Sequence, residues 1–305
     1  MKVRIGFGLG TAAGMAADPA TFGPLVDDLE RLRFDSLWLS ERLSGPAPSP
    51  LAALAFAAGR TTRLKLGTSV LVLPGRNPAV LASDLATIDR LSQGRLLPAV
   101  GLGAVDPVEQ QGFGVERSER AAWFDEALPL LRQLWSGAPV DHAGDRFRYE
   151  GVQVLPTPVQ DPLEVWLGGI APSELRRVGR LGDGWLPSFC TPDDVAAGRP
   201  VVADAATAAG REIDPEHWGA LVLYASGELL DGGALPDRLA AALARRRPGV
   251  DPSSLVPAGL PQLRTTLERF VEGGTSKFVV VPVGEPASWT AELEALAEAV
   301  LPLQV

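Results

Sequence analysis

Residues 63–103 read RLKLGTSVLVLPGRNPAVLASDLATIDRLSQGRLLPAVGLG, and this stretch decides the fold of the chain. It predicts a strand, a loop, a helix that ends near Gly94, a tight turn and a second strand. Both strands run into small residues, Ser69 in the first and Gly101-Leu102-Gly103 after the second. Because the carboxyl ends of parallel strands meet at one edge of a sheet, a planar ligand can lie against the backbone there.

The rest of the chain repeats this alternation of short apolar runs and longer helical patterns, which indicates βα units. The runs that read as strands are Val3–Leu9, Asp35–Ser40, Leu64–Val72, Leu96–Gly101, Val165–Leu167, Gly184–Leu186, Ala220–Tyr224 and Lys277–Val281. Eight strands predict a (β/α)8 barrel, and an open doubly wound sheet is the alternative. We expect one domain over 1–305, with insertions near the pocket at about 140–162, which includes a hairpin, and at about 188–215.

Composition narrows the class of protein. The net charge of −9 argues against a nucleic-acid partner, because phosphate binding needs a basic face. With one cysteine and two histidines, the chain has little scope for a metal site or a histidine-centred triad. Prolines interrupt the longest uncharged stretch, residues 43–59, so no membrane span is expected. These features predict a cytoplasmic enzyme that acts on a small molecule.

The strand ends supply the candidate site residues. Glu41 and Arg42 follow the second strand, either as a catalytic pair or as a solvated ion pair. Gly168 and Gly169 precede a helix that starts near Pro172, so they predict either a phosphate site at a helix amino end or a tight turn. From its apolar pattern alone, Ser69-Val70 reads as barrel packing. Cys190 and His142 have no obvious partner for chemistry and are expected to be structural.

At these residues the chain resembles the luciferase-like monooxygenase superfamily, barrel enzymes that use FMN or the deazaflavin coenzyme F420. The resemblance rests on five segments in the family's order, which are FDSLWLSE (34–41), the 63–103 stretch, RSERAAWFDEALPLLRQLW (117–135), VWLGGIAPSELRRVGRLGDGWLP (165–187) and GLPQLRTTLERFVEGGTSKFVVVP (259–282). The segments span most of the chain, so their order carries more weight than any one of them.

The resemblance implies a site. Ser69-Val70 matches a position where members often carry a non-prolyl cis peptide that supports the flavin ring. Gly101, Leu102 and Gly103 match the edge of the ring and its ribityl chain, and Gly168-Gly169 matches the cofactor phosphate region. Homodimers are common among relatives.

The chain departs from the resemblance at Arg42, where deazaflavin dehydrogenases of the family usually have a histidine that handles the substrate proton. We therefore expect an oxidoreductase that transfers hydride between its cofactor and a small organic substrate, with reduction of the substrate favoured. F420 is favoured over FMN as the cofactor. An FMN-dependent monooxygenase is the alternative. A cofactor-binding protein without turnover and an unrelated phosphate-binding barrel are alternatives of other classes.

Overall fold

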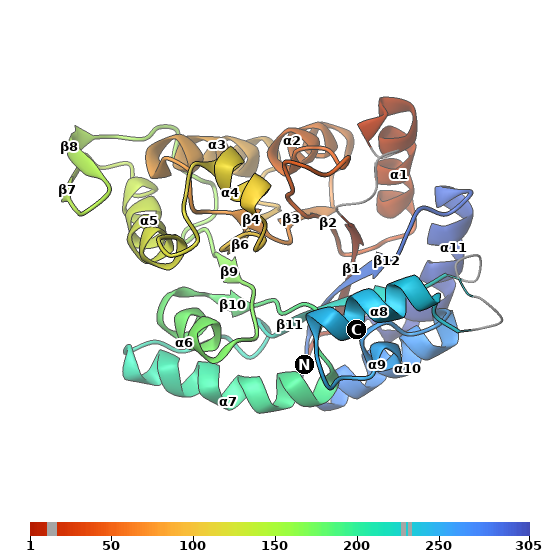
Figure 1. The fold of residues 1–305 in the computed structure, drawn as a ribbon. Coiled ribbons are helices and arrows are strands. Elements are labelled where there is room, and N and C mark those ends of the chain that lie inside the picture. The colour runs from red at the N-terminus through yellow and green to blue at the C-terminus, as the bar shows by residue number, and fades with distance from the viewer. Residues whose placement is uncertain (11–16, 227–229, 231–233) are drawn as a thin grey trace.

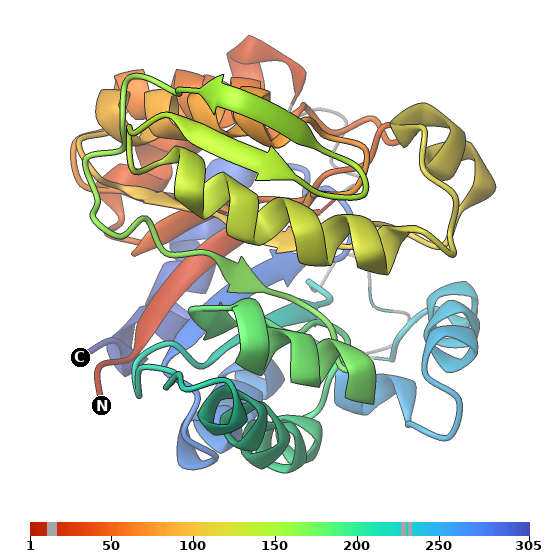
Figure 2. The same cartoon turned by 90° about the vertical axis from the view of Figure 1, so that its left-hand side faces the viewer.

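Parallel strands drawn from the whole length of the chain lie together at the centre of the molecule, and helices surround them (Figures 1 and 2). This computed structural model describes residues 1–10, 17–226, 230 and 234–305. The strands of the described residues are β1 (Arg4–Leu9), β2 (Ser36–Leu39), β3 (Lys65–Thr68), β4 (Leu71–Val72), β5 (Leu96–Leu97), β6 (Ala99–Gly101), β7 (Val140–Ala143), β8 (Arg148–Val152), β9 (Trp166–Leu167), β10 (Gly184–Trp185), β11 (Gly219–Tyr224) and β12 (Lys277–Pro282).

The helices lie between these strands along the chain. They are α1 (Pro19–Arg31), α2 (Pro50–Arg60), α3 (Pro78–Leu91), α4 (Pro107–Phe113), α5 (Arg120–Leu134), α6 (Pro172–Leu181), α7 (Pro192–Ala208), α8 (Asp237–Arg246), α9 (Pro252–Leu255), α10 (Leu260–Glu272) and α11 (Trp289–Val300), with a final 3-10 turn, η3 (Leu301–Leu303). Many begin with proline, whose fixed φ suits the first helical turn and whose missing N–H has no intrahelical acceptor there.

The strand order follows the barrel topology. One parallel sheet runs β11-β12-β1-β2-β3-β5 and a second runs β10-β9-β6-β4. The third predicted strand is divided into β3, in the first sheet, and β4, in the second. The fourth is divided in the same way into β5 and β6, so these two strands connect the sheets on one side. On the other side, parallel bridges from Trp185 to Trp218 and from Ser188 to Leu221 connect β10 to β11. The described strands thus follow one another in the order of a (β/α)8 barrel, as the sequence predicts.

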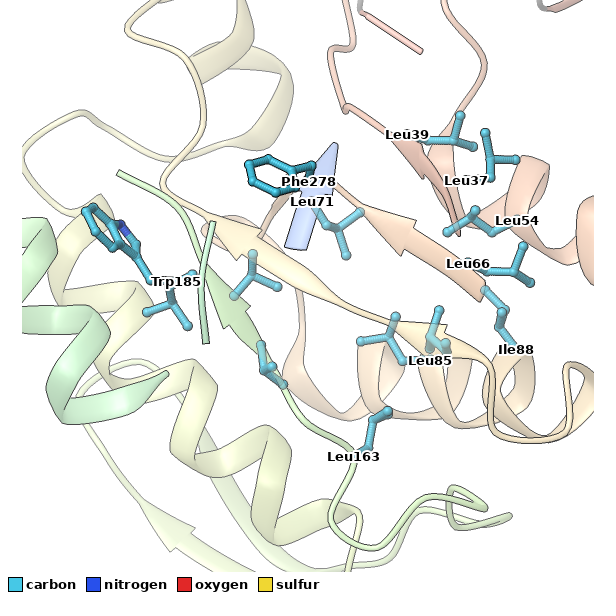
Figure 3. Close-up of a cluster of buried hydrophobic side chains, with 14 of the residues drawn as sticks. Leu37, Leu39, Leu54, Leu66, Leu71, Leu85, Ile88, Leu163, Trp185 and Phe278 are labelled. Carbon is cyan, nitrogen blue, oxygen red and sulfur yellow. The ribbon is translucent and has the colours of Figure 1, made fainter. Parts of the chain in front are cut away.

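Strand β12 shows how the core is divided. Phe278 and Val280 belong to the large apolar cluster between strands and helices, whereas Val279 and Val281 belong to a smaller cluster with Trp38 inside the barrel. Successive side chains of a strand point to opposite faces, so one strand serves both clusters. Figure 3 shows the outer cluster, in which leucines of β2 and β3 lie beside side chains of α2 and α3.

An ion cluster centred on the buried Lys277–Asp35 pair lies at the amino ends of the strands. The Lys277 ammonium lies 2.5 Å from Asp35 Oδ2, and Arg4 and Lys65 lie 3.8 Å from the same carboxylate. Burial lowers the pKa of Lys277 to about 8 although Asp35 opposes the shift. Burial alone would raise the pKa of Asp35, but Lys277 and Lys65 hold it below its usual value.

The structure differs from the predicted elements in several places. The third strand is interrupted at Ser69-Val70, and the short helix α4 was not predicted. The hairpin is present as β7 and β8, but none of the described residues that line the main cavity comes from 140–162. Within 188–215, helix α7 packs on α6, and of that range Ser188 and Phe189 line the cavity. Among the described residues, no helix is both long and apolar enough to cross a membrane.

Candidate functional site

A cavity of about 810 Å³ opens at the carboxyl ends of the strands. Its walls come from the ends of β2, β4, β6, β9 and β11 and from the segments that follow them. The nine residues predicted from the sequence all line it, namely Glu41, Arg42, Ser69, Val70, Gly101, Leu102, Gly103, Gly168 and Gly169. Its size lies within the range of small-molecule and cofactor sites.

The Ser69-Val70 peptide forms part of the cavity wall and is cis. Its carbonyl at Ser69 accepts a hydrogen bond of 2.8 Å from the Ser40 hydroxyl. The Val70 side chain lies between two glycines of neighbouring strands, because a Cβ at Gly101 would come within 2.6 Å of Val70 and one at Gly168 within 3.3 Å. The small residues at these strand ends therefore let three strands close around Val70.

Glu41 is buried and does not pair with Arg42. Its carboxylate accepts a hydrogen bond of 2.8 Å from the Val72 amide and forms an ion pair with Arg76. Burial raises the pKa of Glu41, and the Arg76 guanidinium only partly offsets that effect. The Val72 amide and Arg76 therefore fix the position of the Glu41 carboxylate at the cavity wall.

Arg42 lies at the rim of the cavity and already has acidic partners. Its Nη2 lies 2.7 Å from Asp106 Oδ2, and its Nε lies 3.8 Å from Glu109 Oε1. Glu109, which was not predicted, accepts hydrogen bonds from the Leu43 and Ser44 amides at 3.1 and 2.7 Å. Although burial opposes it, these bonds hold the pKa of Glu109 below its usual value. The contacts of Arg42, Asp106 and Glu109 connect the segment after β2 to the start of α4.

The amino end of α6 differs from the anion site that the sequence suggests. Glu174 Oε2 accepts hydrogen bonds of 3.0 Å from the Ile170 and Ala171 amides, so the protein's own carboxylate occupies these donors. Gly169 has a φ of 102°, and a Cβ there would come within 2.6 Å of Glu174. Its carbonyl accepts a bond of 2.8 Å from Trp185. Among the described residues, its amide hydrogen has no acceptor and remains free for a ligand.

Two arginines that sequence reasoning missed support the cavity. Arg120 is buried and donates from Nη1 to the carbonyls of Leu102, Gly103 and Ala104 at 3.2, 3.0 and 2.8 Å, which holds the segment after β6. Burial lowers its pKa. Arg246 lies over the ring of Phe189. The sequence signal for Arg246 is the run of three arginines, residues 245–247, at the end of α8.

The histidines and the cysteine lie away from the cavity lining. His142 contacts Glu126 at 3.0 Å, and His217 lies 3.3 Å from Glu164, so both have local carboxylate partners. Burial raises the pKa of Cys190 to about 12, which leaves the thiol protonated and unreactive at neutral pH. Within the described part of the chain, no cluster of three metal-ligating side chains is present.

Comparison with known proteins places this geometry in a family. The sequence matches the family model described as luciferase-like monooxygenase over residues 3–228, and the chain belongs to that family. An F420-dependent glucose-6-phosphate dehydrogenase of Nocardia farcinica is 35% identical over 218 residues, which are 66% of this chain and 65% of the relative. Limonene 1,2-monooxygenase of Rhodococcus erythropolis is 28% identical and is aligned over 91% of this chain and 79% of its own length.

Solved structures share the fold. The monooxygenase RslO1 of Streptomyces bottropensis superposes with a TM-score of 0.79 at 24% identity, covering 99% of both chains. The coenzyme F420-dependent tetrahydromethanopterin reductase of Methanopyrus kandleri superposes with a TM-score of 0.79 at 20% identity and covers all of both chains. At this identity the likeness shows the barrel fold alone.

Proposed function

We propose that this protein is an oxidoreductase that transfers hydride between coenzyme F420 and a small organic substrate. The observation that carries the proposal is the cavity wall formed by Val70 between Gly101 and Gly168 at the carboxyl ends of the strands. Family membership supports it, and so do the relatives named as F420-dependent enzymes.

The residues present fit a flavin-type group. Val70, Leu102 and the flanking glycines offer an apolar wall with exposed backbone for a planar ring. The free amide of Gly169 offers a donor to a phosphate oxygen, at the position where the sequence suggests one. Because Glu174 occupies the next two amides, we expect the phosphate to engage Gly169 and side chains, rather than the α6 dipole alone.

When bound, the cofactor supplies a ring that accepts or donates hydride. The chain's own contribution is to position the ring and to exclude water, with Val70 and Leu186 among the apolar lining residues. The hydroxyls of Ser40 and Ser69 lie 3.4 Å apart at the same wall and are available to bind a substrate oxygen or an ordered water. Neither histidine lines the cavity, so any proton that the reaction needs comes from another group.

A monooxygenase that uses FMN and oxygen is the second candidate. Two observations favour it. The cavity lacks a lining histidine to act as the base of an alcohol dehydrogenase, and the limonene monooxygenase aligns over most of this chain. A protein that binds the cofactor without turnover is the remaining alternative.

The expected state of the protein is a cytoplasmic homodimer. The tryptophans of α5 and its end do not supply an obvious contact surface. Trp135 is buried, and its Nε1 donates a hydrogen bond of 3.0 Å to the Ala82 carbonyl. Trp123 packs edge-on against Phe147 of the hairpin segment, with ring centroids 5.5 Å apart.

Titration with the two cofactors tests the proposal. We expect F420 to bind with a Kd below about 100 μM and FMN to bind more weakly. Quenching of cofactor fluorescence measures both affinities. Tighter binding of FMN, with oxygen consumption in the presence of reduced FMN, would favour the monooxygenase. Binding of neither cofactor would refute both enzymes. Hydride transfer to or from a panel of alcohols, ketones and enones, read as a change in cofactor absorbance, separates an enzyme from a binding protein.

A further inference from the structure

Every charged side chain that lines the cavity has an ionic or hydrogen-bonding partner among the described residues, with one exception. The carboxylates of Glu41 and Asp106 pair with Arg76 and Arg42, and Glu174 accepts two backbone amides. Among the cations, Arg177 Nε lies 2.6 Å from Asp125 Oδ1, and Arg247 Nη2 lies 3.0 Å from Asp194. Arg246 is the cavity cation without a carboxylate partner among the described residues.

Arg246 is held in place by an aromatic ring instead. Its Cζ lies 3.9 Å from the centroid of the Phe189 ring, within the range of a cation–π contact. Phe189 packs on a buried cluster that includes Leu243 and Val256, and its φ of 53° is rare for a residue with a side chain. The ring is therefore fixed, and it fixes the guanidinium at the cavity rim.

Arg247, the next residue along the chain, binds the end of α8 to Phe189 as well. Arg247 Nη1 donates to the Phe189 carbonyl, while its Nη2 contacts both oxygens of Asp194 at 3.0 Å. The end of α8 is thus pinned to the segment between β10 and α7. Arg247 has its charge compensated there, so of the arginines that line the cavity Arg246 is the one without a carboxylate partner in the part of the chain that the structure describes.

A simpler role for Arg246 is to complement the negative end of the α8 dipole. Arg245 and Arg246 both lie in the last turn of α8 and share that role. Arg245 does not line the cavity, and no aromatic ring positions it among the described residues. The stacking and the location of Arg246 are therefore features that the dipole does not explain.

We propose that Arg246, positioned by Phe189, binds an anionic group, a phosphate or a carboxylate, of the molecule that occupies the cavity. The guanidinium offers a planar fork of donors that matches the oxygens of either group. Burial against the ring lowers the pKa of Arg246, but a guanidinium remains protonated at neutral pH. The proposal rests on the proposed function for the identity of that molecule.

The other possible anion site of the cavity is less favourable. At the amino end of α6, the Glu174 carboxylate already holds two amides, and its negative charge repels a second anion. A ligand phosphate that uses the Gly169 amide therefore needs a cation to offset Glu174. Arg246 lines the same cavity as Gly169 and Glu174 and has its charge available.

Matched ligands that differ by one phosphate test the proposal on the intact protein. We would measure binding of FMN against riboflavin, and of F420 against its phosphate-free ring and ribityl portion, at low salt. Glucose 6-phosphate against glucose, added to the cofactor-loaded protein, tests a substrate source of the anion. The variants are Arg246→Gln, Arg246→Lys and, as the matched control from the same helix turn, Arg245→Gln.

We expect Arg246→Gln to weaken binding of the phosphate-bearing member of at least one pair about tenfold or more. Binding of its phosphate-free partner should change less than about twofold, since the ring contacts are untouched. Arg246→Lys should retain part of the affinity, and Arg245→Gln should match the parent protein. The pair that responds identifies the cofactor or the substrate as the source of the anion.

A probe that needs no cofactor separates this proposal from the proposed function. Inorganic pyrophosphate should raise the melting temperature of the parent protein and of Arg245→Gln, but not that of Arg246→Gln. If no ring compound binds but this shift persists, the proposed function fails and the anion site stands. If the rings bind and Arg246→Gln changes no phosphate-bearing ligand, or changes both members of each pair equally, the anion site is overturned and the proposed function stands.

Discussion

The two ends of the barrel treat charge in opposite ways. At the amino ends of the strands, Lys277 and Asp35 are buried and satisfied within the protein. At the carboxyl ends, Arg42 and Asp106 lie at a partly exposed rim, and Arg246 faces a cavity of about 810 Å³. The same strands therefore end in a closed ion cluster at one pole and an open site at the other. Ion pairing contributes to folding at the first pole, whereas the second pole presents the arginine that we propose for ligand binding.

The largest expected effect comes from breaking the closed pole. Asp35→Asn should lower the free energy of unfolding by about 3–5 kcal/mol, because it leaves the buried Lys277 ammonium without its carboxylate. Urea denaturation measures this loss. The double variant Asp35→Asn with Lys277→Met should recover most of the stability, since it removes the stranded charge as well.

The rim supplies the comparison for that experiment. Asp106→Asn also removes one partner of an ion pair, but the Arg42 side chain is 39% exposed and stays hydrated. Asparagine also preserves the hydrogen bond that Asp106 makes as the N-cap of α4. The expected loss is below about 1 kcal/mol. Equal losses at the two poles would contradict the distinction drawn between them.

A smaller effect is expected from filling the open pole. Gly101→Val should weaken binding of the cofactor about 10- to 100-fold, because its Cβ would meet Val70 at 2.6 Å and displace the wall of the proposed ring site. Fluorescence titration measures the affinity, and circular dichroism reports the folded fraction.

Gly59→Ala is the matched control for that substitution. Residue 59 lies in α2, and a Cβ there meets nothing within 4 Å. Helix propensity predicts a stability equal to or slightly above that of the parent, with unchanged affinity. If Gly101→Val binds the cofactor as well as Gly59→Ala does, Val70 and Gly101 do not border the ring.

The smallest expected effect is the pH dependence of the closed pole. The folded protein releases the Lys277 proton near pH 8, whereas the unfolded chain keeps it to about 10.5. Between these values the unfolded state binds more protons, so this contribution to stability rises with pH. Relative to Lys277→Met, the parent should gain about 1 kcal/mol from pH 8 to pH 9 and show no relative change from pH 6 to pH 7. A loss of stability relative to Lys277→Met above pH 8 would mean that folding raises the pKa of Lys277 rather than lowering it.

Much of the fold followed from local patterns. Helix α3 (Pro78–Leu91) ends just before the predicted limit near Gly94, and α6 (Pro172–Leu181) begins at the predicted proline. Proline suits the first helical turn, and the apolar spacing is typical of a helix. The interruption of the third strand at Ser69-Val70 did not follow from its apolar pattern, which reads as one continuous strand. The family resemblance indicated a cis peptide there, and the structure has one.

The sequence predicted where the candidate residues lie, but not which residues they pair with. All nine candidate residues line one cavity, because parallel strands bring their carboxyl ends together. Glu41 and Arg42, adjacent in sequence, instead pair with Arg76 and Asp106. Adjacent residues of an extended segment point in opposite directions, so their partners depend on which segments lie on either side.

The sequence by itself determined the order of strands and helices, the small residues at the strand ends and the family, because these depend on periodicity and local backbone preference. The tertiary structure decided which charges are compensated. It placed Glu174 on the amides of α6 and Arg246 on the ring of Phe189. Such contacts join segments distant in sequence, and their strength depends on burial and distance, which exist only once the chain has folded.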